Sequence, residues 1–112
     1  MRRGDIVIIS APGDYGKPRP AVIVQADALN EQHPSIILCP FTSKLVDAPL
    51  LRLEVRPSPR NGLRQVSQIM ADKLLTMKRE KIGSVVGRLE DAIMQRLDAA
   101  LMRVLGLNGE TE

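Results

Sequence analysis

Arg19 is the side chain of this sequence best placed for chemistry, because prolines flank it at positions 18 and 20. A proline fixes its own φ and restricts the residue before it, so the guanidinium is presented with little conformational freedom. Its planar set of N–H donors matches the oxygens of a phosphate. Residues 16–24 therefore predict a cationic loop, with Lys17 as a second charge, that leads into a buried strand. A solvated surface arginine is the alternative for this segment taken alone.

Two hydroxyls and a cation follow an apolar segment further along the chain. Thr42, Ser43 and Lys44 come directly after residues 36–41, where a strand is expected to end. Hydroxyls at such a position either cap a turn or hydrogen-bond a ligand at the mouth of the sheet. The residues by themselves leave both interpretations open.

Metal-ligating and histidine-based chemistry find little support in the sequence. His33 and Cys39 are single residues of their types, and the carboxylates do not gather in a ligand pattern. One histidine cannot supply a histidine acid and base pair, and one thiol cannot build a metal cluster. We expect His33 on the surface, Cys39 in the core, and a site without metal or cofactor.

Composition points to one small domain. The 112 residues are 44% hydrophobic, which fills a single core, so we expect one domain over residues 1–107 and a flexible tail over 108–112. The excess of 16 Lys and Arg over 13 Asp and Glu gives a net charge of +3, compatible with a polyanionic partner. The apolar start is too short for a signal peptide or a membrane span, and a lone cysteine fits a reducing compartment. We expect a cytoplasmic protein without a membrane contact.

Short strands are predicted through the first two thirds of the chain. Residues 6–9 are β-branched throughout, and residues 51–56 alternate strictly between apolar and charged side chains. A loop is predicted over residues 11–20, where prolines and glycines concentrate, and a polar turn over 30–34. The other predicted extended segments are residues 21–25, 36–39, 63–70 and 82–86, with one helical turn over 78–81.

The last element is predicted to be an amphipathic helix. Apolar residues recur at steps of three and four from Leu89 to Leu105, Glu90 and Asp91 lie at its positive end, and Gly106 supplies a C-terminal cap. Many short strands closed by one helix predict a mainly β fold: a small β-barrel with a C-terminal α-helix packed against it.

Taken in order, these segments resemble the PemK/MazF family of toxin endoribonucleases. The resemblance rests on Gly-Asp-Ile-Val at residues 4–7, Gly-Lys-Pro-Arg-Pro-Ala-Val at 16–22 and Pro-Phe-Thr-Ser at 40–43. It continues through Ser-Gln-Ile at 67–69, Asp-Lys-Leu at 72–74 and the closing helix, so it covers nearly the whole chain.

The resemblance implies an SH3-like barrel of the CcdB/MazF/PemK type that works as a homodimer. It implies the toxin of a type II toxin–antitoxin system, a sequence-selective endoribonuclease that cuts single-stranded mRNA and so inhibits translation and growth. The RNA's own 2′-hydroxyl would be the nucleophile, no metal would be needed, and the products would carry 2′,3′-cyclic phosphate and 5′-hydroxyl ends.

The resemblance also assigns roles by position. Arg19 would stabilise the charge of the transition state, and Thr42 would hydrogen-bond the scissile phosphate or orient the attacking hydroxyl. Some relatives carry an acidic residue where this chain has Ser67, which leaves the general base open. Loops 11–18 and 41–49 are the expected readers of bases. The expected RNA-binding residues are Lys17, Ser43, Lys44, Gln65, Ser67 and Gln68.

The expected protein partner is an antitoxin, a short and partly disordered acidic chain that covers Arg19. DNA would be met only indirectly, through a complex with that antitoxin.

Two other functions are compatible with the same barrel. One is a non-catalytic SH3-like module that binds nucleic acid or protein through Lys17 and Arg19. The other is a gyrase inhibitor of the CcdB kind, which relies on a C-terminal tryptophan; this sequence contains no tryptophan.

Overall fold

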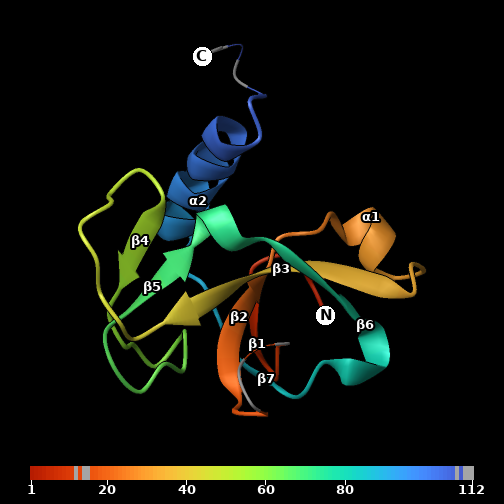
Figure 1. Ribbon diagram of the computed structural model, residues 1–112. Coiled ribbons are helices and arrows are strands. Elements are labelled where there is room, and N and C mark those ends of the chain that lie inside the picture. Colours follow the sequence, from red (N-terminus) through yellow and green to blue (C-terminus); the bar gives the residue numbers. More distant parts are fainter. Residues whose placement is uncertain (12, 14–15, 108, 110–112) are drawn as a thin grey trace.

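The computed structural model describes residues 1–11, 13, 16–107 and 109, which form one curved antiparallel sheet with a helix across it (Figure 1). Its strands are β1 (Asp5–Ile9), β2 (Arg19–Ile23), β3 (Ser35–Thr42), β4 (Arg52–Val55), β5 (Ser67–Met70), β6 (Leu75–Lys78) and β7 (Val85–Arg88). The helices are α1 (Asp27–Asn30) and α2 (Asp91–Val104), with 3₁₀ turns η1 (Ala71–Lys73) and η2 (Arg79–Lys81).

β3 is the strand around which the sheet curves. The sheet order is β4-β5-β3-β2-β1-β7, and β6 also pairs with β3. β2 follows one edge of β3, with Ala21 opposite Pro40, whereas β6 and then β5 follow the other edge (Figure 1). The result is a half-barrel with a C-terminal helix, which confirms the predicted fold class.

Two apolar clusters explain why residues 6–9 of β1 and residues 21–23 of β2 are all apolar. Successive residues of a strand point to opposite faces of the sheet. Ile6 and Val22 therefore pack in the cluster beneath α2, whereas their neighbours Val7 and Ala21 pack in a second cluster on the other face. Both faces of these strands are buried, which explains why residues 6–9 are apolar without alternation.

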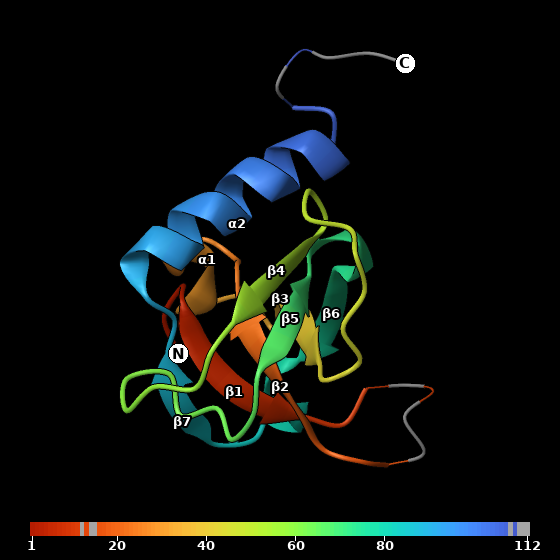
Figure 2. The same ribbon diagram turned by 90° about the vertical axis from the view of Figure 1, so that its left-hand side faces the viewer.

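The predicted C-terminal helix is confirmed, and its ends follow the expected signals. Leu97, Ala100 and Leu101 form its buried stripe against the sheet (Figure 2). Gly106, at a φ of 71°, donates its N–H to the Arg103 carbonyl at 3.2 Å, and Leu107 donates to Met102 at 2.8 Å. These two bonds satisfy the last carbonyls of the helix.

The strands extend through two prolines that the sequence analysis placed outside them. β2 begins at Arg19, so the predicted loop 11–20 is wrong at its end, and Pro20 lies opposite Ile8 in the ladder. β3 runs through Pro40 to Thr42, beyond the predicted 36–39. A proline cannot donate to a ladder, and both prolines lie where one edge of their strand is not paired. β2 pairs with β3 only from Ala21, and β3 changes its partner from β6 to β5 around Pro40.

Other boundaries moved because long-range pairing, not local pattern, ends a strand. Within the predicted extended segment 63–70 only residues 67–70 pair as β5, and the predicted strand 82–86 is replaced by β7 at 85–88. The predicted turn 30–34 is preceded by α1, and β6 was not predicted at all. The helical turn at 78–81 is confirmed as η2, and residues 51–56 as β4. The predicted tail 108–112 lies outside the described residues except for residue 109, and the single-domain boundary stays a prediction.

Cys39 and His33 lie where they were expected. Cys39 is fully buried, and burial raises the pKa of its thiol to about 12, so it stays neutral at physiological pH. His33 is exposed, with its Nδ1 at 3.2 Å from the Ser35 hydroxyl. In the described part of the chain, no helix is both long and apolar enough to cross a membrane.

Candidate functional site

One groove brings the two main candidate residues together. It has a volume of about 820 Å³, and we call it the Arg19 groove. Its walls come from the start of β2, the end of β3, the loop 62–67 and the chain around β7. Arg19, Thr42 and Ser43 all line it, so segments 22 residues or more apart in the sequence meet at one mouth of the sheet.

A hydrogen bond fixes Arg19 beside Thr42. The Arg19 Nη1 donates to the carbonyl oxygen of Phe41 at 3.2 Å, and Phe41 directly precedes Thr42. The Thr42 Oγ1 accepts the backbone N–H of Lys44 at 3.1 Å. A hydroxyl that accepts in this way still has its own hydrogen to donate. Thr42 can therefore cap the turn with its oxygen and still donate a hydrogen bond to a ligand.

The Arg19 groove is cationic and rich in hydroxyl groups. Among the described residues that line it, Lys17, Arg19 and Arg64 are positively charged and none is acidic. Its other polar groups are the hydroxyls of Thr42, Ser43, Ser67 and Ser84 and the amide of Gln65. Cations together with hydroxyl donors, without a carboxylate to repel an anion, suit the phosphates of a nucleic acid.

Two of the predicted RNA-binding residues lie outside the lining of this groove. Gln68 is buried, its Oε1 accepts the Val46 N–H at 3.1 Å, and its Nε2 donates to the Val46 carbonyl at 2.9 Å. It thus holds the loop that follows β3. Lys44 is exposed at the start of that loop. Ser67 does line the groove, but it is largely buried and donates its hydroxyl to the Gln65 carbonyl at 3.0 Å.

Arg64 and Ser84 are groove residues that the sequence analysis missed. Arg64 is exposed and forms no ion pair with any residue that the structure describes. The available signal was its place directly after the turn-forming segment 57–62 and before Gln65. Ser84 reaches the groove only because the chain before β7 runs beside β1, where Ile8 donates to its carbonyl at 3.2 Å.

Asn61 holds the loop that carries Arg64 and Gln65. Its side chain is fully buried. The Oδ1 accepts the N–H groups of Ser58 and Leu63, both at 3.0 Å, and the Nδ2 donates to the Arg56 carbonyl at 2.9 Å and to Glu90 at 3.2 Å. Every hydrogen-bonding group of this amide is used, so the path of the loop is fixed before it reaches the groove.

Two glycines allow the same loop to lie against β7. Gly62 has a φ of +70°, and a Cβ at this position would lie 2.2 Å from the Val86 carbonyl oxygen. A Cβ at Gly87 would lie 2.2 Å from the Asn61 carbonyl oxygen and 2.7 Å from that of Arg60. Real Cβ atoms do not approach backbone so closely, so this contact requires glycine at both positions.

Glu90 joins this loop to the start of α2. Its carboxylate accepts the Ser58 hydroxyl at 2.6 Å and the Asn61 amide. Burial opposes the charged form, but hydrogen bonds from Ser58, from its own backbone N–H and from Asn61, with the nearby Arg60, bring the pKa of Glu90 below its ordinary value of 4.5. The carboxylate also lies at the positive end of the helix dipole.

The Glu90→Gln variant is expected to be less sensitive to acid than the unmodified protein. A lowered carboxyl pKa contributes stability that is present above about pH 4.5 and is lost as pH falls through the folded-state pKa. We expect the substitution to cost about 1 kcal/mol at pH 7 and to flatten the fall in the free energy of unfolding between pH 5 and pH 3, as measured with urea. Glu80→Gln, an exposed position on η2, is the matched control. Equal acid dependence in the two variants would contradict this prediction.

The described residues contain no group of three or more His, Cys, Asp or Glu side chains that could hold a metal ion. The polar side chains among the described groove residues are cations, hydroxyls and one amide, a set that offers hydrogen-bond donors to an anion. The chemistry that this set offers is binding and stabilising negative charge on a phosphate.

Comparison with known proteins gives concordant matches. A family model described as PemK-like, MazF-like toxin of type II toxin–antitoxin system matches residues 2–105. A protein named probable endoribonuclease MazF, from Mycolicibacterium smegmatis, is 46% identical over 110 residues, which are 97% of this chain and 100% of that protein.

Solved structures share the fold. An endoribonuclease in complex with its cognate antitoxin, from a mycobacterial species, has a TM-score of 0.78 at 22% identity and covers 96% of each chain. A MazE–MazF structure from Deinococcus radiodurans has a TM-score of 0.75 at 22% identity, over 95% of this chain and 96% of that one.

Proposed function

Because the chain belongs to the family of PemK-like and MazF-like toxins of type II toxin–antitoxin systems, we propose that it is a sequence-selective endoribonuclease. Its substrate is single-stranded RNA, mRNA in the cell, and cleavage inhibits translation and growth. The observation that carries the proposal is the hydrogen bond from Arg19 to the Phe41 carbonyl, which holds a guanidinium next to the Thr42 hydroxyl in a cationic groove.

The proposed reaction is transfer of a phosphodiester within the RNA. The 2′-oxygen attacks the adjacent phosphorus, the bond from phosphorus to the 5′-oxygen breaks, and the products carry a 2′,3′-cyclic phosphate and a 5′-hydroxyl. One proton leaves the 2′-hydroxyl and one reaches the 5′-oxygen, so the reaction consumes neither water nor an oxidant. No metal takes part in this scheme.

Arg19 and Thr42 have different proposed roles at the phosphate. Negative charge increases on the non-bridging oxygens as the fifth bond to phosphorus forms, and a donor already in place stabilises that charge without rearranging. Arg19 supplies two such donors on one plane. The Thr42 hydroxyl, oriented by its bond from Lys44, donates to the same phosphate or aligns the 2′-hydroxyl.

The remaining groove residues bind the flanking nucleotides. Lys17 and Arg64 are exposed cations that attract neighbouring phosphates, and Ser43, Gln65 and Ser67 offer polar contacts. A serine is a poor base at neutral pH, so Ser67 is proposed as a binding residue and not as the general base. Phe41 is buried, so its ring is not available to stack on a base.

The proposed assembly is a cytoplasmic homodimer that an acidic antitoxin silences. An acidic and partly disordered chain would lie along the cations of the Arg19 groove and exclude RNA by occupying it. DNA would be bound only through the complex with the antitoxin. A mere binding module is the weaker alternative, because the 46% identical relative is named as an endoribonuclease.

The direct test incubates the purified chain with a long single-stranded RNA in excess EDTA. We expect discrete fragments, new 5′-hydroxyl ends that map to one short sequence motif, and cyclic phosphate at the other ends. Protection of the RNA without cutting would support the binding module instead. Cleavage that requires added magnesium would overturn the proposed chemistry.

A further inference from the structure

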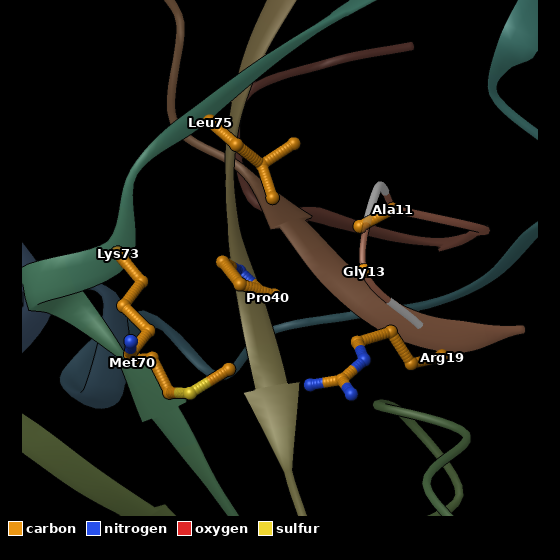
Figure 3. Close-up of a pocket in the computed structure, with 7 residues that line it drawn as sticks. All are labelled: Ala11, Gly13, Arg19, Pro40, Met70, Lys73 and Leu75. Atoms are coloured by element: carbon orange, nitrogen blue, oxygen red, sulfur yellow. The ribbon is translucent and has the colours of Figure 1, made fainter. Parts of the chain in front are cut away.

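A second hollow lies beside the Arg19 groove and shares Arg19 with it. It has a volume of about 330 Å³, and we call it the Lys73 hollow. Figure 3 shows Lys73 and Arg19 on opposite sides of Pro40, with Met70 and Leu75 on either side of Lys73 along the chain. Ala11 and Gly13 complete its lining. Arg19 therefore stands between two concave surfaces.

The Lys73 hollow exists because β3 changes partners. One edge of β3 pairs with β6 through Leu38 and with β5 from Phe41 onward, which leaves a gap at Pro40. The turn η1 spans this gap, between Met70 at the end of β5 and Leu75 at the start of β6. A proline has no N–H group, so the break in pairing leaves no donor unsatisfied at this position.

The chemistry of the hollow is an apolar floor between two cations. Pro40 and Met70 are buried, whereas Lys73 is exposed at the rim. The carboxylate of the neighbouring Asp72 is bound by Arg52, from which it accepts two hydrogen bonds at 2.9 and 3.3 Å. These bonds, with the nearby charges of Arg52 and Lys73, lower the pKa of Asp72. Among the described residues, none forms an ion pair with Lys73.

A single-stranded RNA held at Arg19 must leave in two directions, and each further nucleotide carries one phosphate. The Arg19 groove accommodates the strand on one side. On the other side the Lys73 hollow offers a cation for the next phosphate and an apolar surface for a base or ribose. Its 330 Å³ lies at the lower end of the range for small-molecule sites, which fits one nucleotide and not a duplex.

We propose that the Lys73 hollow is a nucleotide subsite, in which Lys73 binds the phosphate next to the one held by Arg19. The subsite rests on the proposed function, because it extends the path of the same RNA strand. Lys73 is a binding residue here and takes no part in bond breaking.

The test compares Lys73→Gln with Lys78→Gln, a control that removes the same charge from an exposed position of β6 outside both concave surfaces. Binding is measured by fluorescence anisotropy with a random-sequence 2′-O-methyl oligonucleotide, which cannot be cut because its nucleophile is blocked. We expect Lys73→Gln to weaken binding about tenfold. Its plot of log affinity against log salt should lose about 0.7 from the slope, the value for one phosphate on a single strand.

Further variants and substrates locate the contact. Lys73→Arg keeps the charge and should restore binding to within about twofold of the unmodified chain. In cleavage assays Lys73→Gln should raise KM and leave kcat nearly unchanged, because the contact is equal in the ground and transition states. Shortening the RNA one nucleotide at a time from one end should abolish the difference between Lys73→Gln and the unmodified chain.

Equal affinity and equal salt slope in Lys73→Gln and Lys78→Gln would overturn the subsite, whether or not the chain cuts RNA. Binding and cleavage measured together separate the subsite from the proposed endoribonuclease activity. If the unmodified chain binds through Lys73 but never cleaves, the subsite stands and the endoribonuclease activity does not.

Discussion

Replacing Arg19 with alanine is expected to lower RNA cleavage by on the order of a hundredfold to a thousandfold, or about 3–4 kcal/mol in the barrier. The guanidinium is the cation that the Phe41 carbonyl fixes beside Thr42, so its loss removes a donor aimed at the reacting phosphate. The measurement is the single-turnover rate on a labelled RNA in EDTA. The cleavage rate of Arg19→Lys should lie between those of the unmodified chain and Arg19→Ala, because an ammonium keeps the charge but not the planar pair of donors.

Arg96→Ala is the matched control for Arg19→Ala. Arg96 is an exposed residue in the middle of α2, and alanine is the best helix former, so this variant removes an equal charge without harming the fold. Its cleavage rate should stay within about twofold of the unmodified chain. Near-normal cleavage by a folded Arg19→Ala protein, with an unchanged thermal transition, would refute the assigned role.

Gly87→Ala is expected to destabilise the fold strongly. The new Cβ would lie 2.2 Å from the Asn61 carbonyl oxygen and 2.3 Å from its carbon, and both atoms belong to a backbone fixed by buried hydrogen bonds. Neither β7 nor the loop can yield without breaking other bonds. We expect a loss of about 3–5 kcal/mol in the free energy of unfolding, measured with urea.

Gly106→Ala separates this clash from ordinary backbone strain. Gly106 has a φ of +71°, but a Cβ there would meet nothing within 4 Å. Only the left-handed conformation is then unfavourable, at about 1–2 kcal/mol. If Gly87→Ala is no more destabilising than Gly106→Ala, then the loop 57–66 is not held against β7 as the structure describes. Gly87→Ala should also impair RNA binding, because this loop carries Arg64 and Gln65.

The secondary structure could be predicted wherever the local pattern decides it. The β-branched run in β1, the alternation in β4 and the apolar stripe of α2 each reflect a face that must be buried. Residues close together in the sequence are enough to reveal such a pattern. Pro20 and Pro40 were predicted outside the strands. Both lie inside strands because those strands lack a partner on one edge at that point. The neighbouring residues in the sequence do not indicate where a strand will be unpaired.

The candidate site was predicted in part, for a related reason. Arg19 and Thr42 could be picked from the ordered motifs, and the structure brings them together. Gln68 has the type and position of an RNA-binding residue, but its amide is used by Val46. Which side of a strand faces a groove, and which side chains already have partners, depends on the register of pairing over long sequence distances.

The sequence by itself determined that this protein is a mainly β chain with a closing helix, and it predicted a restrained arginine and a hydroxyl pair for its site. Periodicity and proline restriction act within a few residues, so the sequence displays them directly. Only the tertiary structure decided that Arg64 and Ser84 join the Arg19 groove, and that a gap at Pro40 opens the Lys73 hollow. Both depend on contacts between segments distant in sequence, such as the glycine contact of the loop with β7 and the change of partners along β3.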